Sequence, residues 1–138
     1  MIIYCSGPMT NYPDLNRPAF DAAERRLTAQ GHFVINPHRI SALFGTAEKL
    51  KESFAVYYRM LDLDANFFNH TPSTQTLEHT RIARAVMDAD LAAVRSCDAI
   101  YLLRGWENSR GAKKELAEAL KYNLVIMLEG GVECDSRG

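Results

Sequence analysis

The sequence predicts a doubly wound α/β fold with a parallel sheet of four to five strands flanked by helices. Four short segments, each almost continuously apolar, are spaced along the chain, and helical patterns lie between them. Such segments are typical of parallel strands that are covered on both faces. They span residues 2–5, 33–35, 99–103 and 124–128. Strands and helices alternating in this order are typical of a flavodoxin- or Rossmann-like domain.

The helices are predicted from apolar residues that recur at helical spacing. The first begins at Pro18, which suits an opening helical turn, carries Phe20, Ala23 and Leu27 on one face, and ends at Gly31. The last spans residues 109–122. Two more helices, near residues 47–61 and 77–96, are expected on either side of a loop at 62–76.

The chain is expected to form one domain. A length of 138 residues suits a single domain with a core of its own. We assign this domain to residues 1–129, with a helical insertion at about 41–82. The tail at 130–138 has no core pattern and is expected to be mobile.

Composition excludes several classes of partner. A net charge of −1 provides no broad basic surface, so no nucleic acid polymer is expected as a partner. No apolar run in the sequence is long enough to cross a bilayer, and we expect no leader before the first strand. The three cysteines are far apart, which argues against a disulfide framework and favours the cytoplasm. The four histidines lack the spacing of metal ligands, so no metal is expected.

The segment directly after the first strand is the first candidate for ligand binding. In doubly wound folds, ligands bind at the carboxyl ends of the strands. Ser6, Gly7, Pro8, Met9 and Thr10 occupy that position. The glycine would let backbone N–H groups approach a phosphate, although a simple Gly-Pro turn explains the pattern equally well. The segment has neither the Walker pattern nor the dinucleotide fingerprint.

The second candidate is Glu115, near the start of the last predicted helix. It lies on or beside the apolar stripe of that helix, where an unpaired carboxylate is costly to bury. Either it has a chemical role, or it forms a salt bridge at the rim with Arg104, Arg110 or a neighbouring lysine. Asn108 or Ser109 would cap the helix, and Gly111 would open its first turn to a ligand.

The third candidate is Asp90, which falls on the apolar face of the preceding helix with Val86, Met87 and Val94. It is either a buried acid of the site or a residue that tethers a loop.

Trp106, Arg17 and Asn16 are expected near the same crevice, and Asp98, just before the third strand, is expected to be structural. Trp106 would stack on a base or else belong to a lid or to the core. Arg17 would meet an anionic group or face solvent, and Asn16 is expected to cap the first helix. Asp98 is expected to bind loop backbone.

Taken together, these motifs resemble the nucleoside 2-deoxyribosyltransferase-like superfamily, and most closely an uncharacterised branch common in phages and prophages. The matching stretches are residues 3–9 (Ile-Tyr-Cys-Ser-Gly-Pro-Met), 16–20 (Asn-Arg-Pro-Ala-Phe), 36–37 (Asn-Pro) and 97–117, which contains Trp-Glu-Asn-Ser-Arg-Gly-Ala. Residues 41–82 take no part in the resemblance.

The resemblance implies a role for individual residues. Glu115, followed by Leu and a small residue, matches the family nucleophile, and Asp90, eight residues before Asp98, matches the family acid. Ser109 stands where nucleoside-specific members carry Asp. A serine at this position resembles the deoxynucleoside 5′-monophosphate hydrolases, in which hydroxyl and N–H groups receive the phosphate. Two departures concern catalysis: Lys113 replaces a glycine, and Ala117 stands where glycine is usual.

The resulting hypothesis is a nucleotide N-glycosidase or deoxyribosyltransferase that acts on a (deoxy)nucleoside 5′-monophosphate through Glu115. Ser6, Gly7, Pro8, Met9, Arg17, Trp106, Ser109, Arg110 and Gly111 would bind the substrate. No cofactor is required. The alternative is a non-catalytic nucleotide-binding or sensing module of phage or prophage origin. A homo-oligomer is expected, because residues 47–61 carry more apolar side chains than one sheet face can cover.

Overall fold

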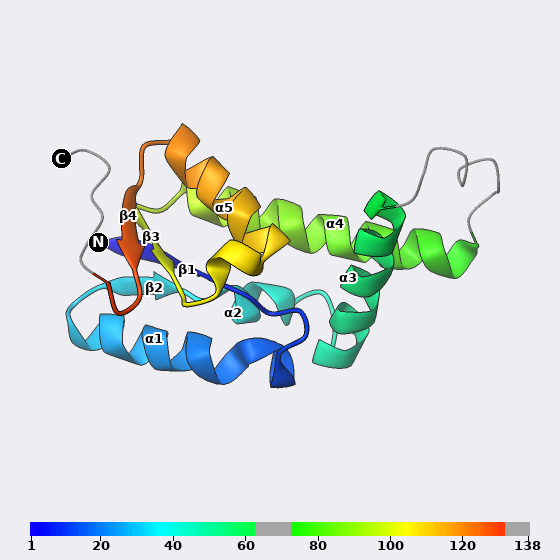
Figure 1. The fold of residues 1–138 in the computed structure, drawn as a ribbon, viewed down its shortest axis with the longest axis horizontal. Helices are drawn as coiled ribbons and strands as arrows, with labels where there is room; N and C mark the ends of the chain where they lie inside the picture. Colours follow the sequence, from blue (N-terminus) through cyan, green and yellow to red (C-terminus); the bar gives the residue numbers. More distant parts are fainter. Residues whose placement is uncertain (63–72, 132–138) are drawn as a thin grey trace.

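The computed structural model, which describes residues 1–62 and 73–131, contains a four-stranded, all-parallel sheet (Figure 1). The strands are β1 (Ile2–Ser6), β2 (Phe33–Ile35), β3 (Ala99–Leu102) and β4 (Val125–Leu128), in the order β2-β1-β3-β4. This confirms the predicted fold class, and all four predicted strands are present. Most of the predicted loop at 62–76, and the tail beyond residue 131, lie outside the described residues.

All four predicted helices are present, and α2 and two short 3-10 helices were not predicted. The α-helices are α1 (Arg17–Ala29), α2 (Pro37–Ser41), α3 (Ala47–Asp62), α4 (Thr74–Arg95) and α5 (Arg110–Lys121); the 3-10 helices are η1 (Pro13–Asn16) and η3 (Trp106–Asn108). Elements of three to five residues are too short to show helical periodicity. No helix in the two described stretches is both long and apolar enough to span a membrane.

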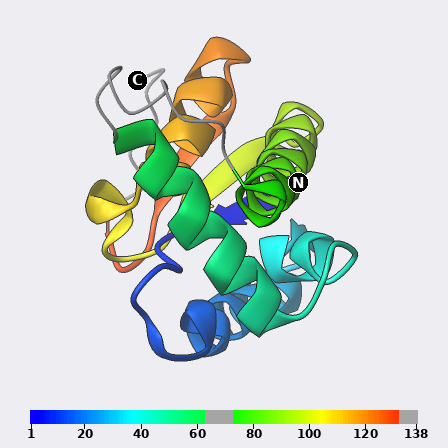
Figure 2. The ribbon, with the colours of Figure 1, turned by 90° about the vertical axis from the view of Figure 1, so that its right-hand side faces the viewer.

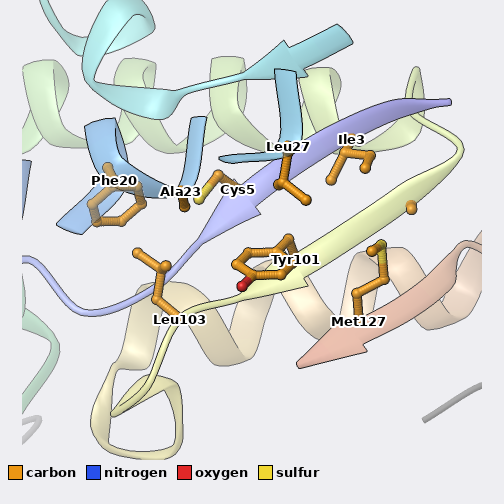
Figure 3. Close-up of a cluster of buried hydrophobic side chains, with 9 residues drawn as sticks. Ile3, Cys5, Phe20, Ala23, Leu27, Tyr101, Leu103 and Met127 are labelled. Carbon is orange, nitrogen blue, oxygen red and sulfur yellow. The ribbon is translucent and has the colours of Figure 1, made fainter. Parts of the chain in front are cut away.

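Helices cover both faces of the sheet, with α1 on one side and α4 and α5 on the other (Figure 1). Successive side chains of a strand point to opposite faces, so β1 contributes to two cores. Ile3 and Cys5 face α1, where they meet Phe20, Ala23 and Leu27 (Figure 3).

The second core lies under α4 and α5. Tyr4, Ile100 and Leu102 point to this face and pack with Val94 of α4 and Ala119 of α5. Tyr4 and Ser6 are fully buried, two positions apart on β1. They are therefore on the same face of the sheet, the one that α5 covers.

Helix α3 covers neither face of the sheet. Figure 2 shows it crossing in front of the carboxyl ends of the strands. Leu50, Ser53 and Tyr57 are its buried residues, and the Ser53 hydroxyl lies 2.8 Å from Nδ1 of His79 on α4. Packed on α4 in this way, α3 forms a roof over the carboxyl edge of the sheet.

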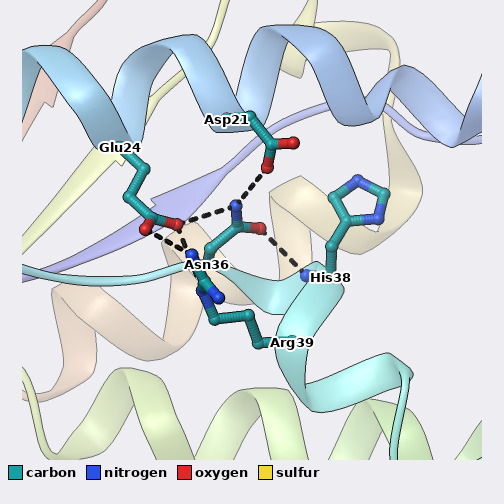
Figure 4. A network of polar contacts seen from close by, with 5 residues as sticks. All are labelled: Asp21, Glu24, Asn36, His38 and Arg39. Atoms are coloured by element: carbon teal, nitrogen blue, oxygen red, sulfur yellow. Dashed lines mark hydrogen bonds and ion pairs between the residues drawn. The ribbon is translucent and has the colours of Figure 1, made fainter.

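Helix α2 is fixed against α1 by the buried side chain of Asn36 (Figure 4). Its Oδ1 accepts a hydrogen bond from the His38 N–H at 3.0 Å, and its Nδ2 donates to Asp21 at 2.9 Å and to Glu24 at 3.1 Å. Glu24 also pairs with Arg39 at 2.6 Å. These bonds hold His38 beside the carboxyl end of the sheet.

Three predictions about single residues can be compared with the structure. Asp98 is structural, as predicted, but the backbone N–H from which it accepts, at 2.8 Å, belongs to Ile2 at the start of β1 and not to a loop. Ser109 caps α5 by accepting from the Ala112 N–H at 3.1 Å. The cap predicted at Asn16 is wrong: its φ is 61°, it makes no side-chain cap bond, and its Nδ2 donates to the Pro8 carbonyl at 2.9 Å.

Candidate active site

A cavity of about 620 Å³ lies at the carboxyl ends of the strands, beneath α3. Its walls come from the β1–η1 loop, the end of α2, the inner face of α3, the middle of α4 and the first turns of α5. In sheets of this strand order, β1 and β3 flank the point where the winding reverses, and ligands bind there. The volume is within the range of small-molecule sites.

Glu115 of α5 lies at the floor of this cavity, with two hydroxyl groups bound to its carboxylate. Tyr4 Oη donates to Oε2 at 2.8 Å and Ser6 Oγ donates to Oε1 at 2.6 Å. Both donors come from the α5 face of β1. Glu115 forms no ion pair with any described residue, so the salt bridge to Arg104 or Arg110 left open above is not present. The position of the carboxylate is set by neutral hydroxyls from the sheet.

Asp90 of α4 lines the same cavity and is only 7% exposed. Its Oδ1 is buried and has no hydrogen-bond partner among the described residues. A buried carboxyl oxygen without a partner is costly, and such atoms gather at functional sites. The orphaned oxygen makes Asp90 a candidate for contact with a ligand or a water molecule at the cavity wall.

The two carboxyl groups share one environment, and both pKa values are raised. Burial, together with the charge of Glu115, raises the pKa of Asp90 to about 9. Burial also raises the pKa of Glu115, to about 7, while the hydrogen bonds from Ser6 and Tyr4 act in the opposite direction. Groups this close titrate as a pair. Near neutral pH, Asp90 holds the shared proton and Glu115 carries the larger part of the negative charge.

The structure brings together most of the residues that the sequence analysis assigned to the site. Those that line the cavity with Glu115 and Asp90 are Gly7, Pro8, Met9, Arg17, Ser109, Arg110 and Gly111. At Gly7 the need for glycine is a matter of packing. A Cβ built there would lie 2.7 Å from the Cβ of Leu103, so the turn after β1 is pressed against the end of β3.

Two assigned residues are not on the cavity wall. Ser6 is fully buried behind Glu115, and its hydroxyl is bound to that carboxylate. Trp106 packs against the core beneath α4 and α5, which matches the core alternative weighed for it. The cavity takes residues 108–112 from this loop and none from 104–107.

The sequence analysis placed residues 36–38 at the crevice but gave His38 no role, and it missed Tyr4 and the contribution of α3. Leu50, Phe54 and Tyr58 of α3 form an apolar and aromatic wall of the cavity. Their spacing of four residues was visible in the sequence, but it does not tell whether that face covers a core or a ligand. His38 also lines the cavity, and its Nε2 is buried with no partner among the described residues.

Arg110 is held by two neighbours on α3. Its Nη1 lies 2.9 Å and 3.0 Å from the two carboxylate oxygens of Asp62. Its guanidinium lies 4.8 Å from the centre of the Tyr58 ring, a cation–π distance. This cation joins the roof helix to the start of α5.

The comparisons with known proteins show the family. The family described as "Domain of unknown function (DUF4406)" matches residues 1–65 and 45–128, which include the whole sheet and both carboxyl groups of the site. The chain belongs to this family. Neither the curated proteins nor the solved structures give a match.

Proposed function

We propose that this protein is a nucleotide N-glycosidase or deoxyribosyltransferase that acts on a (deoxy)nucleoside 5′-monophosphate, with Glu115 as nucleophile. The observation that carries the proposal is the carboxyl pair at the cavity floor. A carboxylate held by two hydroxyl donors lies beside an acid that burial keeps protonated. Glycosyl transfer with retention needs one carboxylate to attack and one acid to assist the leaving group.

The proposed reaction has two steps. An oxygen of Glu115 attacks C1′ of the sugar, the bond from C1′ to the base nitrogen breaks, and Asp90 gives its proton to the departing base. A glycosyl ester of Glu115 results. Water, or the nitrogen of a second base, then attacks C1′, releases the Glu115 carboxylate and returns a proton to Asp90. The hydroxyls of Tyr4 and Ser6 hold the carboxylate in position through both steps.

The first turn of α5 supports a preference for monophosphates. The Ser109 hydroxyl accepts a hydrogen bond from the Ala112 N–H and keeps its own proton for a ligand. The opening N–H groups of a helix have no acceptor within the helix, and the helix dipole favours an anion there. Arg17, Lys51 and Lys114 add positive charge to the cavity wall.

Membership of the nucleoside 2-deoxyribosyltransferase-like superfamily, and of its phage or prophage branch, is part of the proposal. The two departures from the family pattern are compatible with it. Lys113 and Ala117 are both exposed on α5, and neither lines the cavity. The replacement of glycine at these positions therefore leaves the space around Glu115 unchanged.

Release of free base from a panel of ribo- and deoxynucleoside 5′-monophosphates tests the proposal. Glu115→Gln keeps the shape of the side chain but removes the nucleophile, so base release is expected to fall by orders of magnitude while affinity and melting temperature change little. Glu107→Gln is the matched control, because Glu107 is exposed and does not line the cavity.

Two results would contradict the proposed reaction. One is a Glu115→Gln variant as active as the wild type. The other is a wild-type protein that binds a monophosphate and releases no base, which would make the cavity a nucleotide sensor.

A further inference from the structure

Tyr58 of α3 presents a hydroxyl group to the cavity that no described residue uses. The side chain lines the cavity, and none of the described hydrogen bonds includes its Oη. A Cβ built on Gly111 would lie 3.7 Å from this oxygen, so the hydroxyl lies against the first turn of α5 with no side chain between them. The neighbouring Tyr57 differs, since its hydroxyl lies 3.9 Å from Sδ of Met87 and it does not line the cavity.

The position of the Tyr58 ring is fixed from several sides. The ring centre lies 6.0 Å from that of Phe54 and 5.4 Å from that of Tyr57. The Arg110 guanidinium covers the ring, and Asp62 holds that guanidinium through both carboxylate oxygens. A donor held so firmly loses little conformational entropy when a ligand binds.

The same contacts limit what Arg110 can do for a ligand. Its Nη1 is bound to both carboxylate oxygens of Asp62 and its guanidinium lies over the ring, so its charge is already paired and, among the described contacts, only Nε and Nη2 are left to donate to a phosphate. The Tyr58 hydroxyl donates to no residue in the described ranges 1–62 and 73–131. Burial raises its pKa to about 12, so it keeps its proton over the whole neutral range.

We propose that Tyr58 is a specificity-determining residue of this site, whose hydroxyl donates a hydrogen bond to the 5′-phosphate of the ligand, with Arg110 as the residue that positions it. The inference rests on the proposed function, since the phosphate belongs to the proposed substrate. It does not rest on the end of α5 alone, because the orphaned Oδ1 of the buried Asp90 is an independent candidate for contact with a ligand in this cavity. The roof helix thus selects the charged end of the substrate.

Titration calorimetry with the four common deoxynucleoside 5′-monophosphates and their four nucleosides tests this role. A hydrogen bond to a charged group changes affinity by roughly tenfold or more. Tyr58→Phe should weaken every monophosphate that the wild type binds by that factor, and should leave nucleoside affinity within about twofold. Tyr57→Phe, on the adjacent position, should leave both unchanged. An unchanged monophosphate affinity in Tyr58→Phe, or a wild type that binds none of the monophosphates, overturns the proposal.

A double-mutant cycle separates Tyr58 from Arg110. If Arg110 acts by holding the ring, Arg110→Gln weakens monophosphate binding in the wild type and adds little to Tyr58→Phe. Additive losses would mean that Arg110 contacts the phosphate itself, and would overturn its positioning role.

These measurements are independent of turnover. A loss of monophosphate affinity in Tyr58→Phe supports the role of Tyr58 even in a protein that releases no base. Base release by the wild type together with unchanged binding in Tyr58→Phe would reject the role of Tyr58 and leave the proposed reaction intact.

Discussion

Replacing Asp90 with asparagine is expected to stabilise the protein, and to do so increasingly as the pH rises. Asp90 is 7% exposed, and its pKa is raised from 3.8 to about 9, first by burial and then by Glu115. Well below pH 3.8 the carboxyl is protonated in both the folded and the unfolded chain. As the pH rises towards 9, the unfolded chain gains the charged form and the folded chain does not, so stability is lost.

The size of the effect follows from the linkage between the pKa and stability. Neutral pH lies about three units above the ordinary pKa of the group, and each unit corresponds to about 1.4 kcal/mol. The wild type therefore loses at most about 4 kcal/mol between pH 4 and pH 7 at this one position. Asparagine does not titrate, but its buried amide costs about 1–3 kcal/mol wherever it finds no partner. The net gain for Asp90→Asn at pH 7 is about 1–3 kcal/mol.

Urea unfolding of the two proteins at several pH values between 4 and 9 measures this gain. Asp88→Asn is the matched control, because Asp88 is exposed on the same helix. The difference between Asp90→Asn and the wild type should grow steadily with pH, while the control stays close to zero. A variant that is less stable than the wild type at pH 8, or a difference that does not vary with pH, would refute the reasoning.

Three further predictions concern the carboxylate, the α2 cap and the state of assembly. Tyr4→Phe removes one hydrogen-bond donor from Glu115. This loss is expected to raise the pKa of the Glu115 carboxyl by about 1–2 units, measured as a shifted titration of its ¹³C resonance. An unchanged titration would contradict the role of Tyr4. Asn36→Ala removes the cap of α2 and the hydrogen bonds to Asp21 and Glu24. The free energy of unfolding is expected to fall by about 1–3 kcal/mol, measured by thermal unfolding. An unchanged midpoint would count against this role of Asn36. A homo-oligomer remains a prediction that sedimentation tests, with only monomer at micromolar concentration as the opposing result. Leu50 and Tyr57 are buried within the chain and Phe54 and Tyr58 line the cavity, so Leu61 is the exposed large apolar side chain that residues 47–61 offer for such a contact.

The sequence predicted the sheet and the two carboxyl groups because both leave a periodic signal. Four apolar segments separated by helical patterns define a parallel sheet with few alternatives. Asp90 and Glu115 stood out because each interrupts the apolar stripe of a helix. Periodicity shows which residues point inward, and a charged residue among them is conspicuous.

The contacts around the carboxyl groups could not be predicted in the same way. The pattern of β1 shows that Tyr4 and Ser6 share a face, but it does not tell which helix covers that face. Ser6 was therefore assigned to the ligand, whereas its hydroxyl is bound to Glu115. Trp106 belongs to a loop, where no periodicity gives the direction of a side chain, and it packs, partly buried, against the core. The roof provided by α3 depends on how α3 packs on α4 beyond the edge of the sheet, which no periodic pattern specifies.

The two hydroxyl donors of Glu115 occupy adjacent inward positions on a strand that is hydrogen-bonded on both sides, between β2 and β3. A shift of β1 by one residue would replace both hydroxyls with the side chains of Ile3 and Cys5, and would at the same time destroy both cores. The floor of the site thus forms only together with the sheet itself. In hydrogen exchange, the amides of Tyr4 and Ser6 should belong to the slowest class, which opens only when the whole domain unfolds. A ligand would meet a rigid floor, so any adjustment on binding would fall to the roof.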